Sequence, residues 1–117
     1  MTTRTVSRAH RSNHPDPIAL RAGDTVKVGE VYQDDPDWPG WVWCTHARTG
    51  KSGWVPVQLI DRDGDAGTAL EAFTAFELDV SPGQRVTVHR ALNGWSWVED
   101  DAGRQGWVPD RCLTEAG

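Results

Sequence analysis

Two tryptophan-containing stretches decide the fold of this chain: Gly40-Trp41-Val42-Trp43 and Gly50-Lys51-Ser52-Gly53-Trp54-Val55-Pro56. Both recur further along, as Gly94-Trp95-Ser96-Trp97 and Gly103-Arg104-Gln105-Gly106-Trp107-Val108-Pro109. Upstream of them, residues 18–28 match residues 78–88 around a glycine turn. Matched blocks that return in the same order are the mark of an internal repeat. The sequence therefore predicts two copies of one structural unit.

Each copy is predicted to consist of β-strands. Val26 and Val28 alternate with polar neighbours, as do Val86 and Val88, and a period of two indicates half-buried strands. The dipeptide Asn93-Gly94 predicts a tight hairpin turn, because both residues accept positive φ at little cost. We therefore expect an all-β fold.

The boundaries of the two copies are predicted from composition. We expect the first copy to span residues 1–61 and the second to span residues 68–117, with residues 62–67 as a polar, glycine-rich linker. The first copy has a longer acidic loop at residues 34–40. Units of this size bury only about 60% of their unfolded surface, so we expect the two copies to pack against each other.

The composition indicates a folded protein despite a shortage of aliphatic residues. Leu, Ile, Val and Phe together account for only 22 of 117 residues, but seven tryptophans supply large apolar side chains, and the net charge is only −5. No run approaches the roughly 18 apolar residues of a membrane span. The N-terminus lacks the apolar region of a secretory signal, and two cysteines are too few for a disulfide framework. These features predict a cytoplasmic protein that does not contact membranes.

A further set of motifs resembles those of a known protein family. The stretch Ala69-Leu70-Glu71-Ala72-Phe73 is followed by Glu77-Leu78-Asp79-Val80-Ser81-Pro82-Gly83 and then by the second pair of tryptophan blocks. This order resembles the SH3 domain, in which an Ala-Leu-Tyr-Asp-Tyr strand and a Glu-Leu-Ser-Phe segment precede a Trp pair and a Gly-Tyr-Ile-Pro strand. The phrases His14-Pro15-Asp16-Pro17-Ile18 and Thr74-Ala75-Phe76-Glu77-Leu78 resemble a bacterial, two-copy variant of that family. The resemblance implies two SH3-like five-stranded β-barrels in tandem, acting as a non-enzymatic protein-interaction module.

The resemblance also implies which residues would bind a proline-rich or basic peptide. The matching positions are Trp41, Trp54 and Pro56 in the first copy and Phe73, Trp95, Trp107 and Pro109 in the second, with Glu77 at the acidic position that pairs with a peptide Arg or Lys. Several tyrosines of the family pattern are replaced, by Leu59 in the first copy and by Glu71 and Cys112 in the second, while Arg8 and His10 fall at the two early tyrosine positions of the first copy. We therefore expect a peptide surface of altered specificity, lined mainly by exposed tryptophans.

The acidic loop of the first copy is a separate candidate for recognition. Asp34, Asp35 and Asp37 stand beside Trp38 in a segment that has no counterpart in the second copy. An aromatic ring surrounded by carboxylates can bind the Arg or Lys of a partner through cation–π contact. The other interpretation is a solvated loop without a partner.

Two other classes of function stay open. In one, the tryptophan surfaces are buried between the copies or in a homodimer, and the protein has a structural role. In the other, stacked tryptophans bind single-stranded nucleic acid, as small barrels often do. The acidic charge balance argues against the second, because phosphate contacts need cations.

Neither catalysis nor a cofactor is predicted. The sequence contains no evident set of nucleophile, base and orienting group. Cys44 is expected to be a small buried hydrophobe because its counterpart is Val98, and Cys112 is expected to be the more exposed thiol. The four soft ligands of the first copy, His10, His14, Cys44 and His46, lack the spacing of a zinc site, so no metal is predicted.

Overall fold

The computed structural model describes residues 2–12, 16–33, 35–36 and 38–114 and consists of β-strands with two short 3-10 turns. The chain forms two compact units. Unit 1 combines Met1–Pro15 with Glu77–Gly117, and unit 2 consists of Asp16–Phe76. Unit 2 is therefore an insertion between two parts of unit 1. Within the described residues, no helix has the length and apolar character needed to cross a membrane.

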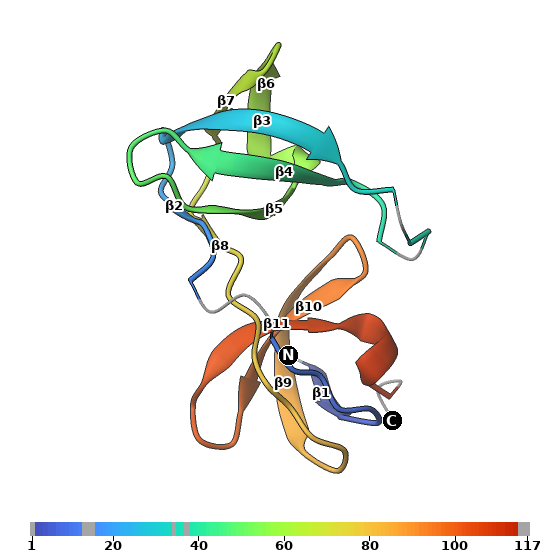
Figure 1. Ribbon diagram of the computed structural model, residues 1–117. Coiled ribbons are helices and arrows are strands. Elements are labelled where there is room, and N and C mark those ends of the chain that lie inside the picture. The colour runs from blue at the N-terminus through green and yellow to red at the C-terminus, as the bar shows by residue number, and fades with distance from the viewer. Residues whose placement is uncertain (1, 13–15, 34, 37, 115–117) are drawn as a thin grey trace. The chain divides into compact units, whose positions relative to one another are not determined.

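Unit 2 contains a five-stranded antiparallel sheet with the strand order β5-β4-β3-β7-β6 (Figure 1). Its strands are β3 (Thr25–Val31), β4 (Trp41–His46), β5 (Ser52–Pro56), β6 (Ile60–Asp63) and β7 (Ala66–Ala69). Two short strands, β2 (Ala19–Leu20) and β8 (Phe73–Thr74), pair in a second sheet, and the 3-10 turn η1 (Val57–Leu59) follows β5. All strands of this unit come from one continuous stretch of chain.

Unit 1 contains a four-stranded antiparallel sheet with the order β1-β9-β10-β11. Its strands are β1 (Thr2–Thr5), β9 (Arg85–Leu92), β10 (Trp95–Asp100) and β11 (Gln105–Pro109), followed by the 3-10 turn η2 (Asp110–Cys112). Figure 1 shows β1, at the blue end of the chain, beside β9 from the distant second half. The edge of this sheet is thus supplied by the N-terminus.

The predicted repeat is visible in the strand register. Trp41 pairs with Pro56 and Trp43 with Trp54 between β4 and β5. Trp95 pairs with Pro109 and Trp97 with Trp107 between β10 and β11. The predicted turn at Asn93-Gly94 joins β9 to β10, with φ of 52° and 88°, as the mirror-image hairpin turns require.

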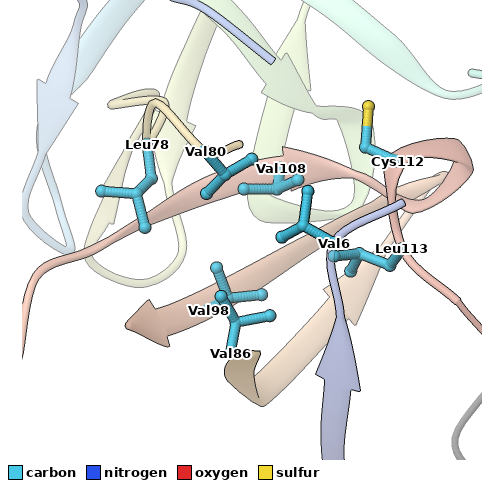
Figure 2. Packing of buried hydrophobic residues seen from close by; sticks show 8 residues of the cluster. All are labelled: Val6, Leu78, Val80, Val86, Val98, Val108, Cys112 and Leu113. Carbon is cyan, nitrogen blue, oxygen red and sulfur yellow. The ribbon is translucent and has the colours of Figure 1, made fainter. Parts of the chain in front are cut away.

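The core of unit 1 is built around the N-terminal segment. Val6 lies in one cluster with Val80, Val86, Val98 and Val108, among other buried residues (Figure 2). Val6 is only 1% exposed, and its N–H and C=O bond the turn before β9, through the Gln84 carbonyl and the Gly83 N–H, each at 2.8 Å. The N-terminal segment is therefore part of the folded core of unit 1.

The division into units differs from the expected boundaries of 1–61 and 68–117. The expected linker 62–67 instead lies in the β6–β7 hairpin, where Arg62 pairs with Gly67 and Asp63 with Ala66. Its turn contains Gly64 at φ 65°. Polar, glycine-rich sequence is typical of linkers and of tight turns alike, so composition did not separate the two.

The all-β fold class is confirmed, whereas two closed five-stranded barrels are not. The four-stranded sheet and the five-stranded sheet each have an open strand order with two ends. The expected count of five strands is met by the sheet of unit 2 alone.

One glycine in each unit lies in close contact with another part of the chain, Gly106 with Leu78 in unit 1 and Gly53 with Ile18 in unit 2. A Cβ on Gly106 would lie 2.7 Å from the Leu78 backbone nitrogen and 2.8 Å from its Cβ. A Cβ on the equivalent Gly53 would lie 2.9 Å from the Ile18 Cγ2, which is a side-chain atom, and 3.4 Å from the Ile18 backbone nitrogen. The backbone of unit 1 therefore has less room to adjust than the Ile18 side chain of unit 2.

We predict that Gly106→Ala lowers the free energy of unfolding by about 1–3 kcal/mol, the usual cost of overpacking a core. The matched change Gly53→Ala should cost less, because its shortest contact is 2.9 Å to a side-chain methyl group, whereas that of Gly106→Ala is 2.7 Å to a backbone atom. Urea unfolding of both variants and of the unchanged chain would measure the difference. An equal or larger loss in Gly53→Ala would contradict this explanation.

Candidate functional site

A cross-strand pair of tryptophans lies on the sheet of each unit. Trp43 and Trp54 face each other with ring centroids 5.1 Å apart and an interplanar angle of 73°. Trp97 and Trp107 repeat this geometry at 5.5 Å and 69°. Edge-to-face contact at this distance is favourable, because the positive ring edge meets the negative face. The pairs arise directly from the shared register of the two hairpins.

In unit 2 the pair is extended into a larger cluster. Tyr32 packs against Trp54 at 5.0 Å, and Trp38 lies 6.1 Å from Tyr32. All four rings, of Tyr32, Trp38, Trp43 and Trp54, are half-buried. We call these four residues the aromatic cluster. Part of each ring therefore remains open to solvent, and adjacent exposed rings are typical of interaction surfaces.

Backbone hydrogen bonds hold the loop between β3 and β4 against the sheet. The Tyr32 N–H donates to the Trp41 carbonyl at 2.8 Å, and the Val57 N–H donates to the Gly40 carbonyl at 2.8 Å. The Trp38 N–H donates to the Asp35 carbonyl at 3.1 Å. This loop therefore presents Tyr32 and Trp38 beside the Trp43–Trp54 pair.

The unit that carries the aromatic cluster is strongly acidic. Residues 16–76 carry ten acidic and five basic side chains, a net charge of −5, and the residues of unit 1 carry seven of each. Of the predicted acidic recognition residues, Asp35 is half-buried in the loop, while Asp34 and Asp37 lie outside the described residues. The aromatic cluster thus belongs to the unit that holds all of the chain's net negative charge.

Unit 1 lacks an equivalent cluster among its described residues. Trp107 is only 5% exposed, and the Trp97 Nε1–H donates to the Gln105 Oε1 at 3.0 Å. Trp95 is half-buried, with the His10 ring edge-on at 5.5 Å. The His10 Nε2 in turn lies 2.7 Å from the Glu77 Oε1. Unit 1 therefore has a smaller site made of Trp95, His10 and Glu77.

The predicted peptide-binding residues divide between exposed and buried positions. Trp54 and Trp95 are half-buried, as a binding surface requires. The other aromatic and proline positions are buried in the described structure, namely Trp41, Pro56, Phe73, Trp107 and Pro109. The expectation that Trp41 and Trp107 are exposed is therefore wrong, because both are at most 6% exposed.

The structure also separates two residues that were expected together. Phe73 was predicted to line the same surface as Trp95, but it pairs with Leu20 in unit 2. His10 stands beside Trp95 instead. Tyr32 was not predicted at all, since it stands alone between β3 and the loop without a repeating pattern around it. Its position directly before the acidic loop was the available signal.

Neither cysteine has the environment of a reactive thiol. Cys44 is fully buried, and its burial raises the pKa of the thiol to about 11. Cys112, at 6% exposed, is the more exposed of the two thiols, as expected, but it is still buried, and burial raises its pKa as well. Since the thiolate is the reactive form, both groups are held in their unreactive state near neutral pH.

No group of three or more potential ligands gathers within the part of the chain that the structure describes. His10 belongs to unit 1, whereas Cys44 and His46 belong to unit 2, and His14 lies outside the described residues. The His46 ring is held by the Asp24 carboxylate at 3.0 Å and accepts the Arg48 N–H at 3.0 Å on its other nitrogen. His46 therefore has a structural role at the β4–β5 turn.

Part of the chain matches a known family model. Residues 5–61 match the family model described as the variant SH3 domain. SH3 domains are protein-interaction modules that are generally non-enzymatic. Neither the curated proteins nor the solved structures with which the chain was compared match it. The matched stretch follows chain order, although residues 5–15 lie in unit 1 and residues 16–61 lie in unit 2.

We predict that Cys44 and Cys112 react slowly with a thiol reagent such as DTNB at about pH 7.5 in the folded chain, and rapidly after unfolding in urea. The cause is burial together with the raised pKa of both thiols. A Cys112→Ser variant would separate the two rates. Reaction of Cys44 in the folded state as fast as glutathione would contradict its burial.

Proposed function

We propose that this protein is a peptide-binding module whose main contact surface is the aromatic cluster of unit 2. The partner is an extended protein segment that carries Arg or Lys, with proline residues as a further feature that flat aromatic rings accommodate. The observation that carries the proposal is the coincidence of four half-exposed aromatic rings with the acidic unit. The match of residues 5–61 to an interaction-module family supports the same class of function.

The chemistry of the aromatic cluster suits a cationic side chain. A guanidinium or ammonium group over the face of Trp or Tyr gains about 0.5–2 kcal/mol, and more where water is excluded. Trp38 and Trp54 flank Tyr32, so a side chain that reaches one ring lies close to the next. The net charge of −5 on unit 2 attracts such a segment before contact is made.

Unit 1 is the weaker candidate for the same ligand. Its acidic residue Glu77 already pairs with His10, and a peptide cation would have to displace that contact. The residues of unit 1 carry no net charge, and Trp107 is buried. We therefore assign the Trp95 site a secondary role in binding.

The burial of Trp41 and Trp107 favours a second, structural function for these two side chains. Both are at most 6% exposed, and large aromatic residues are efficient at filling small cores. The structural alternatives are that the aromatic cluster is covered by the other copy or in a homodimer. Cover by the other copy predicts protection from acrylamide quenching at every protein concentration, whereas a homodimer predicts protection at high concentration and accessibility at low concentration.

We predict that Trp38→Ala weakens binding of an Arg-containing proline-rich peptide by about 3- to 30-fold, the range expected for one lost cation–π contact. The matched control is Trp97→Ala in unit 1, since Trp97 is the counterpart of Trp43 and lies in the unit whose described residues form no equivalent aromatic cluster. Isothermal titration calorimetry would give the dissociation constants. Equal losses in the two variants, or no binding to the unchanged chain at millimolar peptide, would contradict the proposal.

We also predict that the affinity falls with salt. Raising the ionic strength from about 0.1 M to about 1 M shortens the Debye length from about 10 Å to about 3 Å and screens the acidic unit. Asp35→Asn should weaken binding by about 2- to 5-fold, as for a partly exposed charge. Asp101→Asn in the exposed turn of unit 1 makes the same charge change and should have no effect. Binding that does not change with salt concentration would contradict the salt prediction and indicate a purely apolar ligand.

A further inference from the structure

Two segments of the chain occupy the same position in opposite units. In unit 1, Thr5 pairs with Arg85 and Arg4 with Val86. In unit 2, Thr68 pairs with Thr25 and Gly67 with Val26. Since Thr25 and Val26 are the repeat counterparts of Arg85 and Val86, the segments 3–6 and 66–69 lie in identical register.

The hydrogen bonds beyond these strands repeat as well. The Gly83 N–H donates to the Val6 carbonyl, and the Gly23 N–H donates to the Ala69 carbonyl, both at 2.8 Å. The Ser7 N–H donates to the Cys112 carbonyl at 2.7 Å, and the Leu70 N–H donates to the Leu59 carbonyl at 2.8 Å. Further on, His10 bridges to Val80 as Phe73 pairs with Leu20. Each segment thus completes a unit by the same contacts.

We infer that the N-terminal segment 2–12 is specific for the half-unit 77–114 and is rejected by residues 16–61, so that the two repeats exchange these segments within one chain. A pairing in chain order would place segment 2–12 on residues 16–61 and segment 66–73 on residues 77–114. The backbone contacts would be equivalent in both arrangements, so the side-chain contacts determine which arrangement forms.

Sterics exclude the N-terminal segment from unit 2. In chain order, Arg4 would take the position of Gly67. A Cβ on Gly67 would clash with the Ile60 Cγ2 and would lie 3.2 Å from the Val28 Cγ2. Any side chain at this position therefore forces a rearrangement of the core, and that of arginine is among the largest. In unit 1 the same ladder position holds Arg4.

Polar contacts favour the exchanged pairing at the other end of the segment. The His10 Nε2 bonds the Glu77 Oε1 at 2.7 Å, but the repeat counterpart of Glu77 is Pro17, which offers no carboxylate. The Ser12 N–H donates to the Asp79 Oδ1 at 2.7 Å, and the counterpart of Asp79 is Ala19. Both hydrogen bonds would be lost in chain order.

The contacts of Arg11 also favour the exchanged pairing. Its guanidinium donates to the Val80 carbonyl and, at 2.8 Å, to the Ser81 Oγ. The counterpart of Ser81 is Arg21, so pairing in chain order would bring two guanidinium groups together. Like charges in direct contact repel.

The core of unit 1 also prefers the N-terminal segment. Val6 is fully buried among Val80, Val86 and Val108 (Figure 2). Ala69, its counterpart, is smaller by two carbon atoms and would leave a void in this position. Each segment therefore fits the unit in which the structure has it.

Disulfide trapping tests this inference on the full chain. Val6 and Leu113 form a non-hydrogen-bonded antiparallel pair, flanked by the bonds from Thr114 N–H to Thr5 and from Ser7 N–H to Cys112. Such pairs have Cα atoms about 4.5 Å apart, within the range that a disulfide spans. The native thiols are first removed by Cys44→Val and Cys112→Leu, which introduce the residues of the other repeat.

In this background, Val6→Cys with Leu113→Cys should form an intrachain disulfide under mild oxidation, seen as the loss of two hydrogens by mass spectrometry. Val6→Cys with Ile60→Cys, the pair that chain order would bring together, should stay reduced. A disulfide in the second variant would overturn the inference. A Val6–Leu113 disulfide between two chains, seen as a dimer on a non-reducing gel, would overturn exchange within one chain and indicate that a second copy supplies the segment.

The unaltered chain provides an independent test if the cysteine variants do not fold. The exchanged pairing predicts nuclear Overhauser effects between the ring protons of His10 and Trp95, whose centroids are 5.5 Å apart. Effects between Phe73 and Trp95 in their place would overturn it. Binding of peptides by unit 2 is not needed for either readout.

Discussion

The antiparallel pairing of the N-terminal segment with β9 determines how unit 1 is completed. It inserts Val6 into the valine core of unit 1, and it leaves unit 2 to be completed by its own residues 66–74. The placement of the recognition chemistry follows from this exchange. His10 stands beside Trp95 and Glu77, Phe73 lies in unit 2, and the net negative charge collects on residues 16–76.

The two repeats share a backbone ladder but have diverged in what they present to solvent. Both keep the cross-strand Trp pair, at 5.1 Å in one unit and 5.5 Å in the other. Among the described residues, only unit 2 extends its pair, with Tyr32 and Trp38 on a longer loop. In unit 1 the corresponding chemistry is internal, because Trp107 is buried and Glu77 bonds His10. The differences in loop and charge therefore make unit 2 the better candidate for binding.

Much of the fold could be predicted from local signals. The tryptophan blocks and Asn93-Gly94 predicted the hairpins, since turn chemistry and strand alternation act over a few residues. The segment exchange could not be predicted in this way, because the two arrangements offer the same backbone contacts and differ only in distant pairs such as Gly67 with Ile60. The boundaries 1–61 and 68–117 were expected because the polar, glycine-rich stretch 62–67 has the composition of a linker. The burial of Trp41 and Trp107 could not be predicted from the sequence either. Strand alternation assigns a side chain to one face of the sheet but does not indicate what covers that face.

The aromatic cluster of unit 2 is proposed to bind a cationic protein segment. The most direct measurement follows the indole N–H signals of all seven tryptophans by NMR while an Arg-containing proline-rich peptide is added. We predict saturable shifts at Trp38, Trp43 and Trp54, with the unit 1 signals of Trp97 and Trp107 unchanged. Shifts that appear first at Trp95 or Trp97, or that appear equally with a peptide in which Arg is replaced by Gln, would contradict the proposal.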